Sequence, residues 1–187
     1  MILNLRNRRI VLVGKAASGK DHLRKRFQDR HFNYAVTYTT RPPRENEVEG
    51  IDYHFISEDT AKYYISKNLF YEWVEFNGWI YGTTVEQFNT KDLFIMTPKG
   101  ISKIKPEDRE SSFVIYLDIP EDVRRKRLSE RIMPGDSLER RIIADEEDFS
   151  NFFDYDLRIT NTDFCFNFFN IHSLYILLGL LSSNSKS

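Results

Sequence analysis

Residues 14 to 21 read GKAASGKD and bring together the residue types of a phosphate-binding loop. The first seven letters fit the pattern G-x-x-x-x-G-K, in which successive backbone N–H groups can point at anionic oxygens. Gly14 and Gly19 permit the backbone angles and the close approach that such a loop needs. Lys20 would neutralise the charge of a bound phosphate. A glycine turn beside a surface lysine is the minor alternative.

The eighth position of this pattern carries Asp21 where Ser or Thr would hold magnesium through a hydroxyl. A carboxylate is a hard oxygen donor and can bind Mg²⁺ directly or through water. Asp is also common at a helix start as a cap or a partner of the helix dipole. Both interpretations of Asp21 stay open on the residues alone.

A second anion site is predicted in the stretch TYTTRPPRENEVEGIDYHFIS, residues 37 to 57. Arg41 and Arg44 lie three residues apart on a proline-stiffened segment, and each guanidinium can bind a phosphate through a fork of hydrogen bonds. Tyr53 could add a hydroxyl donor. The alternative is a surface loop with solvated arginines.

The phosphate-binding loop requires a strand before it and a helix after it, and the sequence supplies both. Residues 10–13 form a β-branched run typical of a central parallel strand, and the spacing of Leu23 and Phe27 predicts a helix over 20–30. Further parallel strands are expected at 93–96, 113–119 and 157–160, and helices at 120–131 and 137–149.

Residues 33–83 have a different character and predict a small mixed α+β insertion. Aromatic, alternating segments indicate strands, and a helix capped by Ser57 is expected over 57–67. The expected strands lie at 34–39, 53–56, 70–76 and 79–83. The chain is therefore predicted to be a three-layer α/β protein with a parallel sheet and helices on both faces. The core would comprise 1–32 and 84–187, with a helical lid at about 131–138.

Composition excludes several classes of protein. With 41% hydrophobic and 29% charged residues and a net charge of -1, no global basic field favours nucleic acid. The single cysteine, Cys165, excludes an internal disulfide and a cysteine-built zinc site, and suits the cytoplasm. Polar residues interrupt the apolar stretch 164–181, so a C-terminal helix packed on the sheet is expected rather than a membrane span. A membrane or partner contact is the alternative.

Five segments together resemble the guanylate kinase family. The family pattern runs from the phosphate loop through S/T-x-T-T-R-x-P-R, G-x-D-Y-x-F and F-x-E-W-x-x-F to Y-Y-G-S/T. Here these segments read GKAASGKD, TYTTRPPR, GIDYHF, FYEWVEF and IYGTT. The resemblance covers roughly residues 9 to 161, in order and with similar spacing, and implies a P-loop NTPase-type fold.

The resemblance implies a donor site for ATP and a lid. RKRLSER and ERRIIADEEDF resemble the family's lid, in which arginines approach the ATP phosphates. Arg140 competes with its neighbour Arg141 for one such position, and Arg124 and Arg125 are expected to be solvated. The implied catalytic residues are Lys20, Arg44, Arg131 and Arg141. The implied ATP-binding residues are Gly14, Lys15, Ala16, Ala17, Ser18, Gly19, Lys20, Asp21, Arg127 and Asn161.

The resemblance also implies an acceptor site for GMP. Glu72 would read guanine with help from Thr83, since one carboxylate can accept from both N1–H and the exocyclic amine. Adenine has an acceptor at N1, and a site built on such hydrogen bonds can discriminate by about 10⁴. A solvated Glu72 between Tyr71 and Trp73 is the alternative. The implied GMP-binding residues are Thr37, Arg41, Arg44, Tyr53, Glu72, Tyr81 and Thr83.

The sequence departs from the family at its metal-binding positions. Asp21 replaces Ser or Thr, while Ile95 and Thr97 stand where the family usually carries acids. We hypothesise that the carboxylate has migrated, so that Asp21 organises Mg²⁺ in place of those acids. An Asp after the loop lysine is also a feature associated with ribose bisphosphate kinases of this fold.

The resemblance implies an enzyme that phosphorylates GMP or dGMP with ATP and Mg²⁺, as a monomer or homodimer. One alternative is a kinase for another acceptor, such as a modified deoxynucleotide or a ribose bisphosphate. A catalytically silent binding module is another, although the retained loop glycines and Lys20 argue against it. Nucleotides are then the expected partners, with nucleic acid excluded.

Overall fold

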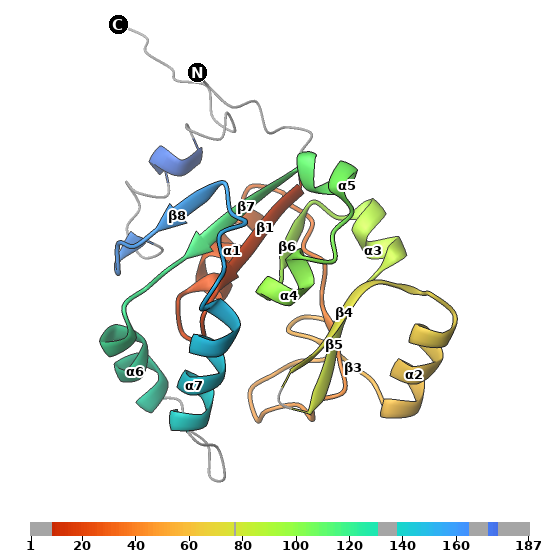
Figure 1. Cartoon of the computed structure of the whole chain (residues 1–187). Helices are drawn as coiled ribbons and strands as arrows, with labels where there is room; N and C mark the ends of the chain where they lie inside the picture. The colour runs from red at the N-terminus through yellow and green to blue at the C-terminus, as the bar shows by residue number, and fades with distance from the viewer. Residues whose placement is uncertain (1–8, 77, 131–137, 165–171, 176–187) are drawn as a thin grey trace, which may run out of the picture.

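A four-stranded parallel sheet forms the centre of the molecule, with strands in the order β6-β1-β7-β8 (Figure 1). The computed structural model describes residues 9–76, 78–130, 138–164 and 172–175, without the side chains of 140 and 141. The strands are β1 (Arg9–Gly14), β6 (Leu93–Ile95), β7 (Ser112–Leu117) and β8 (Leu157–Ile159).

Both faces of this sheet are buried, because successive β1 side chains enter two different cores. Ile10 and Leu12 pack with helix α1, whereas Val11 and Val13 pack with residues of α3 and α4 and with the end of α7. The predicted three-layer arrangement is therefore confirmed. The helices around the sheet are α1 (Lys20–Gln28), α3 (Val85–Thr90), α4 (Pro98–Ile101), α5 (Pro106–Glu110), α6 (Glu121–Ser129) and α7 (Leu138–Phe149).

A second sheet, of mixed direction, lies beside β6 and α4 (Figure 1). Its order is β3-β2-β5-β4, with β2 parallel to β3 and the other pairs antiparallel. It comes from the segment for which the sequence predicts an insertion. Its elements are β2 (Tyr38–Thr39), β3 (His54–Phe55), α2 (Glu58–Ser66), β4 (Phe70–Phe76) and β5 (Trp79–Thr84).

The strand expected over 34–39 is shorter in the structure. Tyr34 makes an isolated parallel bridge with Leu93 at the edge of the first sheet, and only Tyr38–Thr39 belongs to the second. The Tyr34 ring is buried in the core, with the Arg24 guanidinium 4.7 Å from its centroid. The chain therefore crosses from one sheet to the other within this stretch.

An aromatic cluster joins α1 to the C-terminal part of the chain. Phe27 is fully buried and packs edge-on against Phe32 and Tyr175, with ring centroids 5.2 and 5.5 Å away. Residues 172–175 are helical, and Leu174 is also buried. The rest of the expected C-terminal helix lies outside the described residues. Within the described part of the chain, no helix is long and apolar enough to cross a bilayer.

Replacing Phe27 by Ala should destabilise the protein by about 3–5 kcal/mol, because it leaves a cavity at the centre of this cluster. Urea unfolding followed by tryptophan fluorescence measures the change. Phe153, which is 77% exposed, gives the matched control, and Phe153→Ala should change stability little. Equal losses in both variants would contradict the packing described here.

Candidate functional site

The loop after β1 has the shape of an anion cradle. A Cβ added at Gly14 would lie 2.7 Å from the Leu117 carbonyl and from the Ser18 hydroxyl, so only glycine fits there. Gly19 has a φ of 103° and precedes α1 without a side-chain cap, which leaves the first N–H groups of the helix available. The Ser18 hydroxyl is buried and has no hydrogen-bond partner among the described residues.

Lys20 lies over this loop. Its ammonium donates hydrogen bonds to the carbonyls of Gly14, at 2.6 Å, and Lys15, at 3.1 Å. Burial lowers the pKa of Lys20, although the charges of Asp21 and Asp145 oppose the change. A cation held at this place can meet an anion entering the cradle without reorganising the backbone.

Helices α6 and α7 contact the same loop from the side. Arg127 donates to the Ala17 carbonyl at 3.2 Å and to the Thr162 carbonyl at 2.6 Å. This places an expected ATP-binding residue at the loop. From α7, Glu146 pairs with Lys15 at 2.5 Å.

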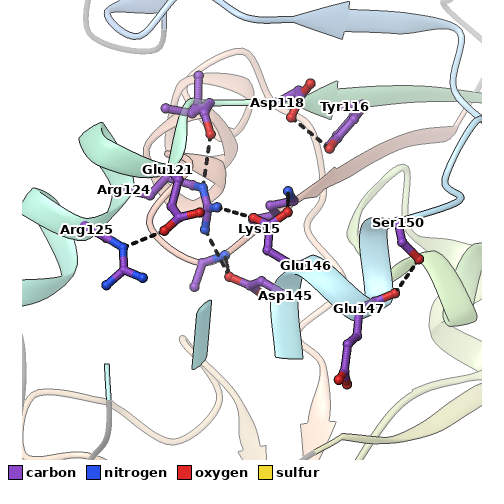
Figure 2. A network of polar contacts seen from close by, with 12 residues as sticks. Lys15, Tyr116, Asp118, Glu121, Arg124, Arg125, Asp145, Glu146, Glu147 and Ser150 are labelled. Carbon is purple, nitrogen blue, oxygen red and sulfur yellow. Dashed lines mark hydrogen bonds and ion pairs between the residues drawn. The ribbon is translucent and has the colours of Figure 1, made fainter. Parts of the chain in front are cut away.

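Arg124 is 1% exposed, so the expectation that it is solvated is wrong. Its Nε donates to the Ile119 carbonyl at 3.0 Å, and its guanidinium lies between two carboxylates of α7, Asp145 and Glu146 (Figure 2). The basic pattern of α6 did not reveal this, because α7 supplies both acids from about 20 residues further along.

The two arginines after β2 converge on one carboxylate. Nη2 of Arg41 lies 2.8 Å from both oxygens of Glu47, and Nη1 of Arg44 lies 3.4 Å from one of them. The Arg44 backbone N–H also donates to Glu47, at 2.9 Å. Glu47 was not among the expected site residues, although its place three residues after Arg44 was a usable signal. Glu47 therefore keeps the two guanidinium groups together.

Two tyrosines stand beside this pair of arginines. The ring centroids of Tyr53 and Tyr81 are 6.1 Å apart, and the Arg41 guanidinium lies 5.2 Å from the Tyr53 centroid. Burial raises the pKa of Tyr53 to about 12, with smaller contributions from Tyr81 and Asp21. Because the charge of Asp21 acts on the Tyr53 hydroxyl, the start of α1 lies near the arginine pair and its tyrosines. The backbone carbonyl of Thr37, just before β2, accepts a hydrogen bond from the backbone N–H of His54.

Glu72 on β4 is buried and lies opposite Thr83 on β5. Burial raises the pKa of Glu72 to about 7, while hydrogen bonding to Thr83 and the charge of Lys103 oppose the rise. A Cβ added at Gly100 would lie 3.0 Å from the Glu72 carboxylate, so α4 closely covers this group. A solvated Glu72 is thus excluded.

The neighbours of Glu72 anchor β4 to the core. Tyr71 stacks on Phe88 with centroids 3.6 Å apart and donates to Asp108 at 2.6 Å. Lys103 hydrogen-bonds to the Trp73 carbonyl and lies over its ring. Tyr71 therefore ties β4 to α3 and α5, and the Trp73 contacts tie it to the segment just after α4.

The remaining expected site residues are less enclosed. Asp21 has an 81% exposed side chain, with Oδ1 3.6 Å from Arg24 Nε. The described residues contain no group of three or more His, Cys, Asp or Glu side chains suited to a metal. Asn161 is exposed and accepts from the Asp163 N–H at 2.9 Å. Thr97 caps α4 by accepting from the Gly100 N–H at 3.1 Å.

Two expected lid arginines cannot be placed. Arg131 lies outside the described residues, as does most of the lid. Arg141 belongs to α7, but its side chain is not among those described, and the same holds for Arg140.

Comparisons with known proteins agree on one family. The family model "Guanylate kinase" matches residues 6–168. The guanylate kinase of Prochlorococcus marinus is 31% identical over 165 residues, covering 82% of this chain and 90% of that protein. That of Sus scrofa is 30% identical over 151 residues, covering 75% and 76%.

A solved structure shows the same fold. The crystal structure of guanylate kinase from Anaplasma phagocytophilum matches with a TM-score of 0.68 at 20% identity, covering 94% of this chain and 89% of that one. The extent of the family match and the identity to its members lead to one conclusion: the chain belongs to the guanylate kinase family.

Proposed function

We propose that the chain transfers the terminal phosphoryl group of ATP to GMP or dGMP, giving ADP and GDP or dGDP. The observation that carries this proposal is a second group of anion-binding residues near the phosphate loop. The charge of Asp21, at the end of the 14–21 cradle, acts on the Tyr53 hydroxyl, and Tyr53 lies beside the Arg41–Arg44 pair. Membership of the family supports the same reaction.

The donor phosphates would lie in the cradle, against the N–H groups before α1, the Ser18 hydroxyl and Lys20. No covalent intermediate and no dedicated base is required, because phosphoryl transfer is accelerated mainly by positioning and charge stabilisation. Lys20 would stay in contact with the transferred phosphoryl group and neutralise its charge. Arg127 would hold α6 against the loop. We propose Arg131 and Arg141 as the lid cations that exclude water from the reacting group.

The acceptor phosphate would displace Glu47 from the guanidinium groups of Arg41 and Arg44, with hydroxyl donation from Tyr53 and Tyr81. Thr37, just before β2, would be a further contact of this phosphate. Two convergent guanidinium groups hold a dianion in one orientation, which brings its oxygen into line with the donor.

Guanine would be read by Glu72 together with Thr83. The carboxylate is buried, so a base that leaves it without donors suffers a large desolvation penalty. This favours guanine over adenine. It also distinguishes a guanine nucleotide from a ribose bisphosphate, which has no base to satisfy Glu72.

The residues present fit a magnesium ion held by one carboxylate. Mg²⁺ commonly takes one or two carboxylates together with substrate phosphates and waters. Asp21, exposed at the start of α1, would be that carboxylate. When bound with ATP, the ion would neutralise charge on the donor phosphates. We propose the cytoplasm as the compartment and nucleotides as the partners.

A coupled assay with GMP, dGMP, AMP, CMP and UMP tests the substrate. GMP or dGMP should be phosphorylated about 10³-fold or more faster than AMP, measured as kcat/KM, since adenine cannot satisfy Glu72. Comparable turnover of AMP, or ATP binding without turnover of any monophosphate, would overturn the proposal.

Glu72 predicts a pH dependence of stability. Its folded pKa is raised from 4.5 to about 7, so the folded protein holds this proton more tightly than the unfolded chain. The free energy of unfolding should therefore fall as the pH rises through this window, by about 3 kcal/mol at most. Urea unfolding at about pH 5 and about pH 8 measures the change, and Glu72→Gln should remove it. The same slope in both proteins would contradict the burial of a titrating carboxyl.

Asp21→Ala tests the proposed metal ligand. The variant should require about tenfold more Mg²⁺ for half-maximal activity and should turn over more slowly, because the ion loses its protein ligand. Activity titrated with Mg²⁺ at saturating ATP measures this. Asp29→Ala, an exposed acid just beyond the end of α1, is the control. An unchanged magnesium requirement in Asp21→Ala would refute the role.

A further inference from the structure

A carboxylate of α7 occupies part of the phosphate loop. Asp145 Oδ2 accepts a hydrogen bond from the Ala16 N–H at 2.7 Å, and the same oxygen lies 3.3 Å from Arg124 Nη1. Asp145 is 8% exposed. A backbone N–H of the loop and a guanidinium are the partners that a phosphate oxygen would take in this position.

The neighbouring carboxylate reinforces the contact. Glu146 binds Lys15 at 2.5 Å and Arg124 Nη2 at 2.8 Å. Helix α7 therefore presents two successive acids, Asp145 and Glu146, to the loop and to Arg124 of α6 (Figure 2). Burial raises the pKa of Asp145, against which the Ala16 N–H and the charge of Lys20 act. The positive charge of Lys20 therefore acts on the Asp145 carboxylate.

A phosphate and this carboxylate cannot use the same donors together. Both are anions and repel each other, and the Ala16 N–H points at one acceptor. Arg124 can stay in place if Asp145 leaves, because the Ile119 carbonyl holds its Nε at 3.0 Å and Glu146 holds its Nη2. Its Nη1 would then be available to a new anion.

We propose that Asp145 is an intramolecular competitor of the donor phosphate: it holds the Ala16 N–H and Arg124 Nη1 in the nucleotide-free protein and gives up both to a phosphate oxygen when ATP binds. Arg124 is then a phosphate-binding residue of the donor site. This inference rests on the proposed function, since it requires that residues 14–21 bind ATP. The inference adds one residue of α6, Arg124, and one residue of α7, Asp145, to the nucleotide site.

Asp145→Asn separates the competing charge from the shape of the side chain. The variant should bind ATP about five- to tenfold more tightly, since a charged acceptor is replaced by a weaker neutral one. Calorimetry with ATP and Mg²⁺ measures the dissociation constant, and the affinity for GMP should not change. Glu147→Gln is the matched control, because Glu147 is an exposed acid of the same helix. It should leave both affinities unchanged.

Unchanged or weaker ATP binding by Asp145→Asn would overturn the inference. A loss of affinity seen only with Mg²⁺ would also overturn it, because Asp145 would then serve the metal. Failure of the wild-type protein to bind ATP would instead overturn the proposed donor site itself, so the two failures are distinguishable.

A second measurement does not depend on the variant being folded. In a crystal structure of the wild-type protein with a non-hydrolysable ATP analogue, a phosphate oxygen should contact the Ala16 N–H and Arg124, with Asp145 displaced. Asp145 still bound to the Ala16 N–H beside the nucleotide would overturn the inference.

Discussion

The cations of this site repel one another, and the protein holds them together with its own carboxylates. Arg41 and Arg44 share Glu47, while Lys15 and Arg124 share Glu146. Removing Glu47 would leave the largely buried Arg41 guanidinium without its carboxylate partner, which is unfavourable. Under the proposed function, the substrate phosphates would replace one carboxylate at each site: Glu47 at Arg41 and Arg44, and Asp145 at the loop, where Glu146 stays on Arg124.

The carboxylate proposed to bind guanine is stabilised in a different way. Glu72 is buried and makes no ion pair within the described part of the chain, so burial raises its pKa, and the main compensation comes from Thr83 and Lys103. A base with two N–H donors would satisfy this group in full. Under the proposed function, the phosphate end of the acceptor site would use charge, whereas the base end would use hydrogen bonds that a wrong base cannot make.

The sequence predicted the frame of this site well. The β-branched run before the glycine loop and the Leu23–Phe27 spacing identified β1 and α1, because a central strand and an amphipathic helix each have a strong local period. The aromatic alternation of β4 and β5 identified the second sheet and placed Glu72. Tyr34 was misassigned to a strand because its bridge to Leu93 depends on a segment nearly 60 residues away.

The network around Arg124 could not be read from the sequence, because its members come from three separate segments. Arg124 belongs to α6, its carboxylates belong to α7, and their target belongs to the loop after β1. A basic helix and an acidic helix each look solvated on their own. Only the packing of α6 against α7 reduces the exposed fraction of Arg124 to 1%. Glu47 is an exception, because its place three residues after Arg44 is a local signal, although its contact with Arg41 depends on the loop folding back on itself. Local periods therefore predict which elements exist, while the charges that tune a phosphate site are settled by contacts between elements.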